Sequence, residues 1–320
     1  MKAATRIIYG PPKVIEVKEI EKPTPKANEV LVKVMATTVN RTGCALLTGK
    51  PYIMRAFVGL FKPRDLVLGV DFAGIVEAIG SNVTSFKIGD RVWGLNDEGL
   101  QSQAEYLTIS TKKAIVKMND DVSFTDAAAS AEGPHYARNF MTNLKLKPGD
   151  KVLLNGATGG IGSAALQMLK ANGNYVTAVG NTKNLALLKS LGADKIYNYE
   201  TEDFTKDDEK YDFVFDSVGK SQFSKCKPLM ADGAVYISSE LGPYAQNLYL
   251  PTLTKFSKKR VRFPFPFKPK KSLEYMNSLA AQGKYKPVID RTYALKDIAE
   301  AYAFVLTGQK TGNVVIDMTL

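Results

Sequence analysis

The sequence predicts an α/β fold in which a doubly wound parallel sheet is inserted into a β-rich domain. Three observations support this prediction: a glycine-rich turn directly after the apolar run 152–154, alternating strand and helix patterns beyond residue 151, and strand patterns throughout the first third of the chain. The chain has 320 residues, of which 45% are hydrophobic. At ~150 residues per domain, this length indicates two domains.

The first third of the chain has the patterns of half-buried strands. Apolar and polar residues alternate over 14–20 and 30–35, with a Pro23-Thr24-Pro25 turn between them. A longer apolar stretch covers 66–80, and a turn at 85–90 leads into another short strand at 91–94. From Thr125 the apolar spacing becomes helical. We therefore expect a β-rich domain that ends near residue 122.

From Lys151 onwards, strand and helix patterns alternate. We expect strands at 152–154, 175–179, 195–199, 213–216 and 233–238, with a helix at 185–191. This alternation is typical of a doubly wound parallel sheet. Helices at 273–281 and 295–306 and a strand at 313–318 follow, so the first domain is expected to be discontinuous.

Composition limits the cellular setting. Cys44 and Cys226 are the only cysteines, too few for a disulfide framework, which indicates a reducing compartment. We find no basic N-terminus followed by a long apolar run and no stretch of about 18 apolar residues. We therefore expect a cytoplasmic protein with no membrane segment.

The net charge is +11, and part of the excess lies in the segment 255–271, which has no acidic residue. Its cations, Lys255, Lys258, Lys259, Arg260, Arg262, Lys268, Lys270 and Lys271, are interleaved with Phe256, Phe263, Phe265 and Phe267. Such a pattern could bind nucleic acid, because bases stack on aromatic rings while phosphates meet cations. Three prolines in the segment favour the alternative, an extended solvated crossing between domains, so no nucleic-acid partner is expected.

The glycine-rich turn predicts a phosphate site at the start of a helix. It comprises Gly156, Ala157, Thr158, Gly159, Gly160, Ile161 and Gly162. Glycine permits unusual backbone angles and a close approach of the main chain to a pyrophosphate, and the bare amide groups at a helix start bind anions. A glycine turn without a ligand is the alternative. The preceding turn at 147–150 and the helical spacing after Ile161 favour a dinucleotide.

The end of the next strand indicates which dinucleotide is bound. NAD sites usually place an acid there, about 20 residues after the turn, to hold the ribose 2′-hydroxyl. Here the sequence continues Val179-Gly180-Asn181-Thr182-Lys183, without an acid. We therefore expect Asn181 and Lys183 to face a 2′-phosphate and the protein to prefer NADPH over NADH. The alternative is that Lys183 is simply an exposed residue in the first turn of a helix.

Several motifs together resemble the medium-chain dehydrogenase/reductase superfamily, in particular its zinc-free quinone oxidoreductase branch. They are Gly69-Val70-Asp71-Phe72-Ala73-Gly74, Phe86-Lys87-Ile88-Gly89-Asp90-Arg91-Val92, the glycine turn, Ser190-Leu191-Gly192-Ala193-Asp194, Asn198-Tyr199, Asp216-Ser217-Val218-Gly219 and Thr311-Gly312-Asn313-Val314-Val315. The resemblance covers nearly the whole chain. It implies a Rossmann-type NADP-binding domain at 123–267, inserted into a GroES-like catalytic domain formed by 1–122 and 268–320.

The resemblance also implies site residues. Ser217 and Val218 would contact the cofactor, Tyr199 the 2′-phosphate, Asn40 the nicotinamide ribose, and Tyr52 the substrate. It further implies a homodimer through outer strands of the nucleotide sheets, with 245–250 as the expected edge strand.

The chain departs from the family pattern at three positions. Relatives commonly have Asn-Pro-x-Asp where this chain has Arg41 and Gly43 after Asn40, and many have Lys at the position of Asn313. The missing carboxylate at Gly43 leaves open how Asn40 is oriented. Lys310 could replace the missing lysine.

Metal chemistry is not expected. Zinc-dependent relatives have an early Cys ligand and Gly-His-Glu where this chain has Gly69-Val70-Asp71, and its only histidine is His135. A catalytic zinc needs three protein ligands. Without a metal to polarise the substrate oxygen, suitable acceptors are those made electrophilic by conjugation, such as quinones and enones.

Candidate proton donors lie in the segment 131–136. The resemblance implies that this segment faces the nicotinamide in a cleft between the domains. His135 and Tyr136 could supply the hydrogen bond or proton that an oxyanion or enolate requires after hydride transfer. The alternatives are that His135 only packs the start of a helix and that solvent supplies the proton.

The resulting hypothesis is a zinc-independent, NADPH-dependent oxidoreductase acting on a quinone or an α,β-unsaturated carbonyl such as an alkenal. A 2-enoyl thioester reductase is the alternative within enzymes, because the positive charge would suit coenzyme A or an acidic carrier protein. An NADPH-responsive RNA-binding module using the segment 255–271 is the alternative from another class.

Overall fold

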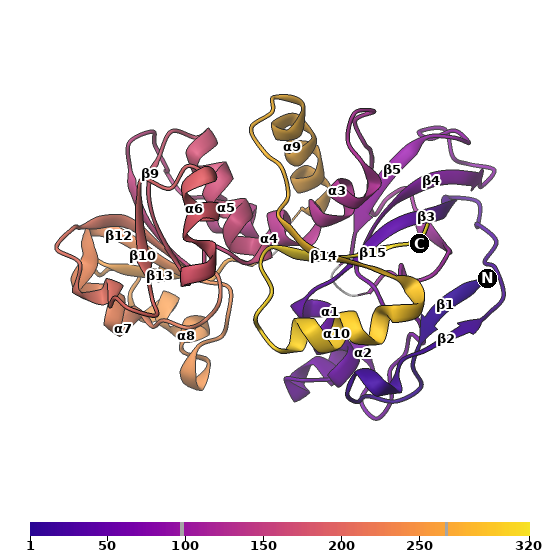
Figure 1. The fold of residues 1–320 in the computed structure, drawn as a ribbon, viewed down its shortest axis with the longest axis horizontal. Coiled ribbons are helices and arrows are strands. Elements are labelled where there is room, and N and C mark those ends of the chain that lie inside the picture. The colour runs from indigo at the N-terminus through magenta and orange to yellow at the C-terminus, as the bar shows by residue number, and fades with distance from the viewer. Residues whose placement is uncertain (97–98, 266–267) are drawn as a thin grey trace. The chain divides into compact units, whose positions relative to one another are not determined.

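The computed structural model describes residues 1–96, 99–265 and 268–320. The chain divides into two compact units, one formed by Met1–Glu132 with Lys268–Leu320 and the other by Gly133–Phe267 (Figure 1). The first division falls ten residues after the boundary predicted between 122 and 123. The predicted boundary between 267 and 268 falls partly on residues outside the described ones. That the first unit binds substrate and the second binds NADP stays a prediction.

The first unit is β-rich, as predicted. Its main sheet has the strand order β14-β15-β3-β4-β5-β7, and β6 also pairs with β3. The strands are β3 (Glu29–Val39), β4 (Asp71–Ile79), β5 (Arg91–Leu95), β6 (Tyr106–Ser110), β7 (Ala114–Lys117), β14 (Ile289–Ala294) and β15 (Asn313–Asp317). A separate antiparallel pair is formed by β1 (Lys2–Thr5) and β2 (Glu16–Glu19).

Buried apolar clusters stabilise the first unit. Val32, Phe72 and Val92 are fully buried on one side of the sheet. On the other, Leu47 of α1 (Arg41–Thr48) packs with Tyr302 of α10 (Ile298–Leu306). The remaining helices of the unit are α2 (Arg55–Val58), α3 (Phe124–Ala129) and α9 (Pro269–Ala281). Ser123 begins α3 by accepting a 3.0 Å hydrogen bond from the Asp126 amide.

The second unit contains the predicted doubly wound parallel sheet. Its order is β10-β9-β8-β11-β12-β13, and every pairing along it is parallel. The strands are β8 (Lys151–Asn155), β9 (Tyr175–Gly180), β10 (Lys195–Asn198), β11 (Tyr211–Asp216), β12 (Met230–Ser238) and β13 (Arg260–Arg262). In chain order this is 3-2-1-4-5-6, so the strand order reverses between β8 and β11, where such sheets bind ligands.

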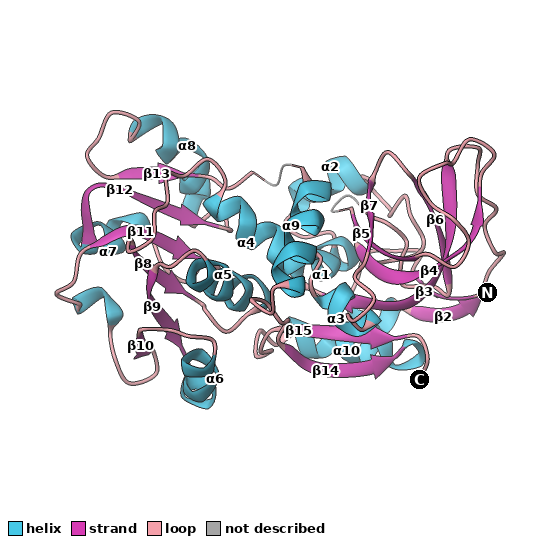
Figure 2. Cartoon of the chain, turned by 90° about the horizontal axis from the view of Figure 1, so that it is seen from above, coloured by secondary structure: helices cyan, strands magenta, loops and turns pink. Residues whose placement is uncertain are grey.

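Helices flank this sheet. They are α4 (Glu132–Met141), α5 (Gly160–Ala171), α6 (Leu185–Ser190), α7 (Phe223–Cys226) and α8 (Gln246–Leu253). Figure 2 shows α5 running along β8 and β9, onto which it buries Ala164, Ala165 and Met168. These small and flexible side chains let the helix pack closely on the strands.

The predicted edge strand at 245–250 is wrong. These residues enter α8, which packs on β13, and the described edges of the sheet are β10 and β13. A short apolar run such as Leu248-Tyr249-Leu250 does not distinguish a strand from a helix by its spacing. The edge beside β12 is already paired with β13, so no strand position is left for the run.

The basic and aromatic segment is not one extended crossing. It contains β13, and α9 begins at Pro269. Pro266 and Phe267 of this segment lie outside the described residues. Within 1–96, 99–265 and 268–320, no helix is long and apolar enough to cross a membrane.

Candidate cofactor and substrate site

The glycine turn connects β8 to α5. At two of its positions there is no space for a side chain. Gly156 has φ +77°, and a Cβ there would lie 2.4 Å from Val218 Cγ1. A Cβ on Gly162 would lie 2.1 Å from the Gly156 carbonyl oxygen. Gly159 differs, because its nearest neighbour would be 3.9 Å away. Gly156 and Gly162 therefore allow close packing, whereas Gly159 leaves open space in front of the helix.

The start of α5 fits a phosphate group. Gly159 is its N-cap and supplies no side-chain hydrogen bond, so the first amide groups of the helix have no intrahelical acceptor and no cap. The open space at Gly159 and the aligned peptide dipoles of a 12-residue helix favour an anion there. The residues present therefore fit the pyrophosphate of a dinucleotide.

The turn after β11 meets the glycine turn at the point where the strand order reverses. The Ser217 hydroxyl lies 2.9 Å from the Asn155 carbonyl oxygen and 3.0 Å from that of Gly156. The Asp216 carboxylate accepts the Asn155 side-chain amide at 3.1 Å and the Gly219 amide at 3.0 Å. The structure thus brings the predicted residues 156–162 together with Ser217 and Val218.

Asp216 is a buried organising residue of this junction. Its second oxygen accepts the Ser221 amide at 3.1 Å and the Tyr236 hydroxyl at 3.3 Å. Burial raises the pKa of the Asp216 carboxyl, and the hydrogen bonds oppose that shift. Asp216 fixes the loop that carries Ser217 and Val218.

The ends of β9 and β10 meet at the second predicted cofactor region. The Tyr199 amide donates to the Gly180 carbonyl oxygen at 3.0 Å, which brings the end of β10 beside Asn181. Lys183 is exposed in the 3-10 helix Thr182–Asn184. Tyr199 is 55% exposed, so its ring is accessible to a ligand.

The carboxylate of Glu200, just after the end of β10, also lies in this region. The sequence pattern did not predict it. Glu200 accepts the Thr182 amide at 3.0 Å and the Thr182 hydroxyl at 2.6 Å. These hydrogen bonds lower the pKa of Glu200, so it is charged at neutral pH. The strand β9 itself ends without an acid, as expected, but the pairing of β10 with β9 supplies one from 20 residues further on.

His135 is fully buried in α4, and its ring packs against Tyr136 with the centroids 5.7 Å apart. The Asn139 side-chain amide donates to the His135 carbonyl oxygen at 2.8 Å. Burial, together with the charge of Arg138, lowers the pKa of His135 to about 4. The imidazole is therefore neutral at pH 7. Tyr136 is only partly buried.

Asn40 and Tyr52 belong to the first unit and lie in different surroundings. Asn40 is buried and donates to the Thr38 hydroxyl oxygen at 2.7 Å. Tyr52 is 68% exposed, with the Arg55 guanidinium 5.0 Å from its ring centre. No hydrogen bond or ring contact joins Tyr52 to Asn40 in the described part of the chain.

A buried polar network surrounds Asn40. Asp71 accepts the Thr38 amide at 2.8 Å and the Thr38 hydroxyl at 2.5 Å. Burial raises the pKa of Asp71 to about 7. Asp71 orients Thr38, and Thr38 in turn orients Asn40. This network therefore holds the Asn40 side chain in place although position 43 is a glycine and has no carboxylate.

Glu132 is a second buried carboxyl that sequence reasoning missed. Burial raises its pKa, and hydrogen bonds from Thr42 and Asn40 oppose that shift. Its Oε2 atom is buried and has no hydrogen-bond partner among the residues that the structure describes. An acid that directly follows the small residues 127–131 was the available signal. Because a buried unpaired acceptor is costly, this oxygen suits a ligand that donates a hydrogen bond.

Lys310 contributes positive charge near Glu132. Desolvation lowers its pKa to about 8, while the attraction of Glu132 raises it. Its ammonium group donates to the Gly312 carbonyl oxygen. Lys310 thus supplies a positive charge three residues before Asn313, the position at which many relatives have a lysine.

Among the described residues, no group of three or more His, Cys, Asp or Glu side chains could hold a metal ion. Cys44 and Cys226 are both buried free thiols. Burial raises the pKa of Cys44 to about 12, so it remains protonated and unreactive.

Comparisons with known proteins agree with this geometry. Residues 26–120 match the family "Alcohol dehydrogenase GroES-like domain", and residues 191–316 match "Zinc-binding dehydrogenase". A chloroplast envelope quinone oxidoreductase homolog of Arabidopsis thaliana is 32% identical over 313 residues, covering 93% of this chain and 92% of that protein. An NADPH-dependent alkenal/one oxidoreductase of the same plant is 29% identical, covering 99% and 79%.

Comparison with solved structures supports the same family. The structure of the quinone oxidoreductase from Coxiella burnetii superposes with a TM-score of 0.89 at 27% identity, covering 99% of both chains. Family membership implies an oxidoreductase with a nicotinamide cofactor, consistent with the glycine turn and the uncapped start of α5. The chain therefore belongs to the medium-chain dehydrogenase/reductase superfamily, in its quinone oxidoreductase-like branch.

Proposed function

We propose that the protein is a zinc-independent, NADPH-dependent reductase of quinones or α,β-unsaturated carbonyls. The observation that carries the proposal is the junction at Gly156. There an uncapped helix start and the Ser217 loop meet where the strand order reverses. The bound cofactor would supply the hydride.

The chain's own residues would bind and orient the cofactor. The amides at the start of α5 hold the pyrophosphate, with Ala157 and Thr158 in the turn and Val218 packed against Gly156. Lys183, Asn181 and Tyr199 hold the 2′-phosphate. The NADPH-dependent relative from Arabidopsis thaliana supports this choice of cofactor.

Asn40, fixed through Thr38 by Asp71, would hold the nicotinamide ribose. The exposed Tyr52 would contact substrate. Of the two proton-donor candidates, Tyr136 keeps a partly exposed side chain, whereas His135 is buried and neutral. We therefore assign proton donation to Tyr136 and packing to His135. Turnover by Tyr136→Phe at the full wild-type rate would contradict this assignment and leave solvent as the proton source.

We also infer a cytoplasmic homodimer. The edge strand β13 presents a row of backbone groups with no further strand paired to it among the described residues, which suits pairing with a second copy. Analytical ultracentrifugation should give twice the 35.0 kDa chain mass. A monomer at micromolar concentration would contradict the dimer.

Stopped-flow oxidation of NADPH tests the function directly. A panel of a quinone, a short enal and an enoyl thioester is compared, with NADH measured in parallel. We expect faster turnover of the quinone or the enal than of the thioester, and preference for NADPH. The fastest rate with the enoyl thioester would assign the protein to the enoyl reductases instead. Absence of turnover with every acceptor would overturn the proposal.

A further inference from the structure

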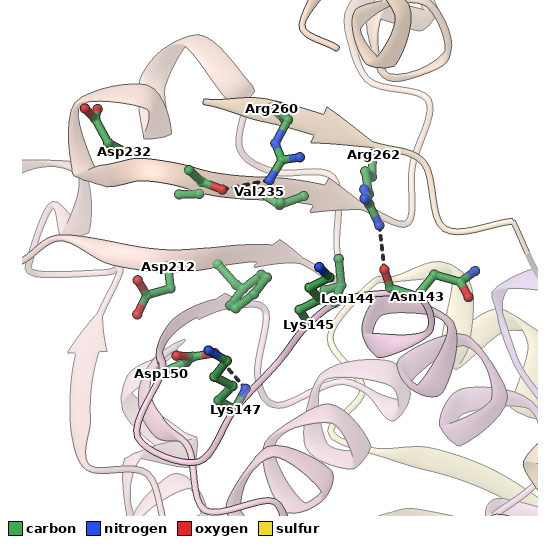
Figure 3. A pocket seen from close by; sticks show the side chains of 13 residues that line it. Asn143, Leu144, Lys145, Lys147, Asp150, Asp212, Asp232, Val235, Arg260 and Arg262 are labelled. Atoms are coloured by element: carbon green, nitrogen blue, oxygen red, sulfur yellow. Dashed lines mark hydrogen bonds between the residues drawn. The ribbon is translucent and has the colours of Figure 1, made fainter. Parts of the chain in front are cut away.

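A cavity of about 440 Å³ lies in the second unit, away from the glycine turn (Figure 3). Asp150 precedes β8, Asp212 lies at the start of β11, and Gly233 lies near the start of β12. The glycine turn, by contrast, follows the end of β8. In a parallel sheet the starts and ends of strands lie at opposite edges, so the cavity is separate from the proposed cofactor site. Its volume falls within the range of roughly 300–1,000 Å³ that small-molecule sites have.

Three of the four cations that line the cavity are Arg260, Arg262 and Lys145, and the fourth, Lys147, lies beside Asp150 (Figure 3). Arg260 and Arg262 are two residues apart on β13 and therefore point to the same face of the sheet. Arg262 donates to the Asn143 carbonyl oxygen at 2.7 Å, and Arg260 donates to that of Gly233 at 3.0 Å. These bonds fix both guanidinium groups while leaving most of their N–H groups available. The exposed Lys145 adds a third charge.

None of these three cations forms an ion pair with a carboxylate within residues 1–96, 99–265 and 268–320. Of the lining acids Asp150, Asp212 and Asp232, only Asp232 forms an ion pair with a described residue. Asp232 pairs with Lys258 at 2.8 Å, outside the group of three cations. An anion beside these three cations would therefore meet charge that the protein does not neutralise.

Hydrogen-bond acceptors also line the cavity, as the view in Figure 3 shows for Asp150 and Asp212. Asp150 Oδ2 accepts the Lys147 amide at 2.7 Å, and Asp212 Oδ2 accepts the Lys151 amide at 2.8 Å. The Oδ1 atoms of both carboxylates accept no hydrogen bond from any described residue. Carboxylate oxygens held in this way are suitable acceptors for sugar hydroxyl groups.

We propose that this cavity binds a small phosphorylated carbohydrate. Its phosphate lies against Arg260, Arg262 and Lys145, because the planar arginine fork matches phosphate oxygens. Its hydroxyl groups donate to Asp150 and Asp212. The cations and the carboxylates thus recognise the two chemical parts of one ligand.

Calorimetric titration of the full chain with glucose 6-phosphate tests the proposal. Binding is expected both without NADPH and with saturating NADPH, because the two sites lie at opposite edges of the sheet. The double variant Arg260→Gln with Arg262→Gln should bind at least about tenfold more weakly. The double variant Lys112→Gln with Lys113→Gln removes the same charge from an exposed turn of the first unit and should bind like wild type.

Two further comparisons separate the cations from the carboxylates. Asp150→Asn with Asp212→Asn should weaken glucose 6-phosphate severalfold and leave inorganic phosphate unchanged. If the double arginine variant does not fold, Lys145→Gln, whose side chain is exposed, tests the phosphate contacts. No binding at low salt, loss of binding on adding NADPH, equal affinity in the arginine variant, or inorganic phosphate binding as tightly as glucose 6-phosphate would each overturn the proposal.

Discussion

At the scale of single residues, burial decides which polar groups can exchange protons. His135 and Tyr136 are neighbours in sequence, but only Tyr136 retains contact with solvent. Burial holds His135 neutral, and it holds the carboxyls of Asp71 and Glu132 at raised pKa values. Of the two candidates that the sequence offered, we therefore propose Tyr136 and not His135 as the proton donor.

His135 should make the protein less stable in acid. Its pKa is about 4 in the folded state and about 6.5 in the unfolded state, so between these values the unfolded chain binds the extra proton. The free energy of unfolding should fall by about 2 kcal/mol from this group between pH 7 and pH 4.5. His135→Gln removes that dependence, which urea unfolding at both pH values measures. Equal losses of stability in wild type and variant would contradict the depressed pKa.

Glu200 should weaken the preference for NADPH. Its carboxylate is held at Thr182, beside the region where we expect the 2′-phosphate, and like charges repel there. Glu200→Gln should raise the NADPH-to-NADH ratio of kcat/KM by about fivefold, the size expected for an exposed charge. Glu202→Gln is the control, because Glu202 also accepts a backbone amide, that of Asn198, at 3.0 Å. A ratio that changes equally in both variants would show that Glu200 has no specific role.

At the scale of elements, the proposed cofactor-binding region is a junction between strand ends and a helix start. The turn after β8, the start of α5 and the turn after β11 are joined by hydrogen bonds of Ser217 and Asp216. Each element contributes only part of the region. The parallel order of the sheet brings the parts together, because the strands β8 and β11 end at the same edge.

Two glycines of this junction should respond differently to alanine. In Gly162→Ala the new methyl group would meet the Gly156 carbonyl oxygen, so α5 must move, at a cost of about 1–3 kcal/mol in unfolding free energy. Gly159→Ala has space for the methyl group and should keep its stability, yet the group would enter the proposed phosphate site. We expect Gly159→Ala to lose NADPH affinity without loss of stability, measured by cofactor fluorescence and urea unfolding. Unchanged affinity in Gly159→Ala would place the phosphate elsewhere.

At the scale of the whole molecule, the chain combines a β-rich unit and a doubly wound parallel unit. Each unit has its own buried clusters. Each also holds some of the proposed site residues: Asn40 and Tyr52 belong to the first, and the glycine turn, His135 and Tyr136 to the second. The activity should therefore depend on the intact chain.

The activity should be independent of metal ions. The described residues hold no group of three or more His, Cys, Asp or Glu side chains that could hold one. Dialysis against EDTA should leave the rate of NADPH oxidation unchanged within error, and added zinc should not increase it. A loss of activity that zinc restores would contradict a zinc-independent reaction.

The sequence by itself determined the fold class, the glycine turn and the family resemblance. These features depend on local patterns. Apolar periodicity predicts the strands and helices, and the glycines within 156–162 occur where the backbone turns and packs closely. The prediction of an edge strand at 245–250 was wrong because it also used only a local pattern. A short apolar run carries no information about which positions in the sheet are already occupied by other strands.

Only the tertiary structure decided which polar groups meet. Glu200 reaches Thr182 through the pairing of β10 with β9, and Asp71 reaches Thr38 through the pairing of β4 with β3. It also decided that the pKa of His135 falls well below its ordinary value, since burial shifts the pKa that the residue type sets. Contacts between residues far apart in the chain, and the solvent they exclude, follow from strand order and packing, which no local pattern specifies.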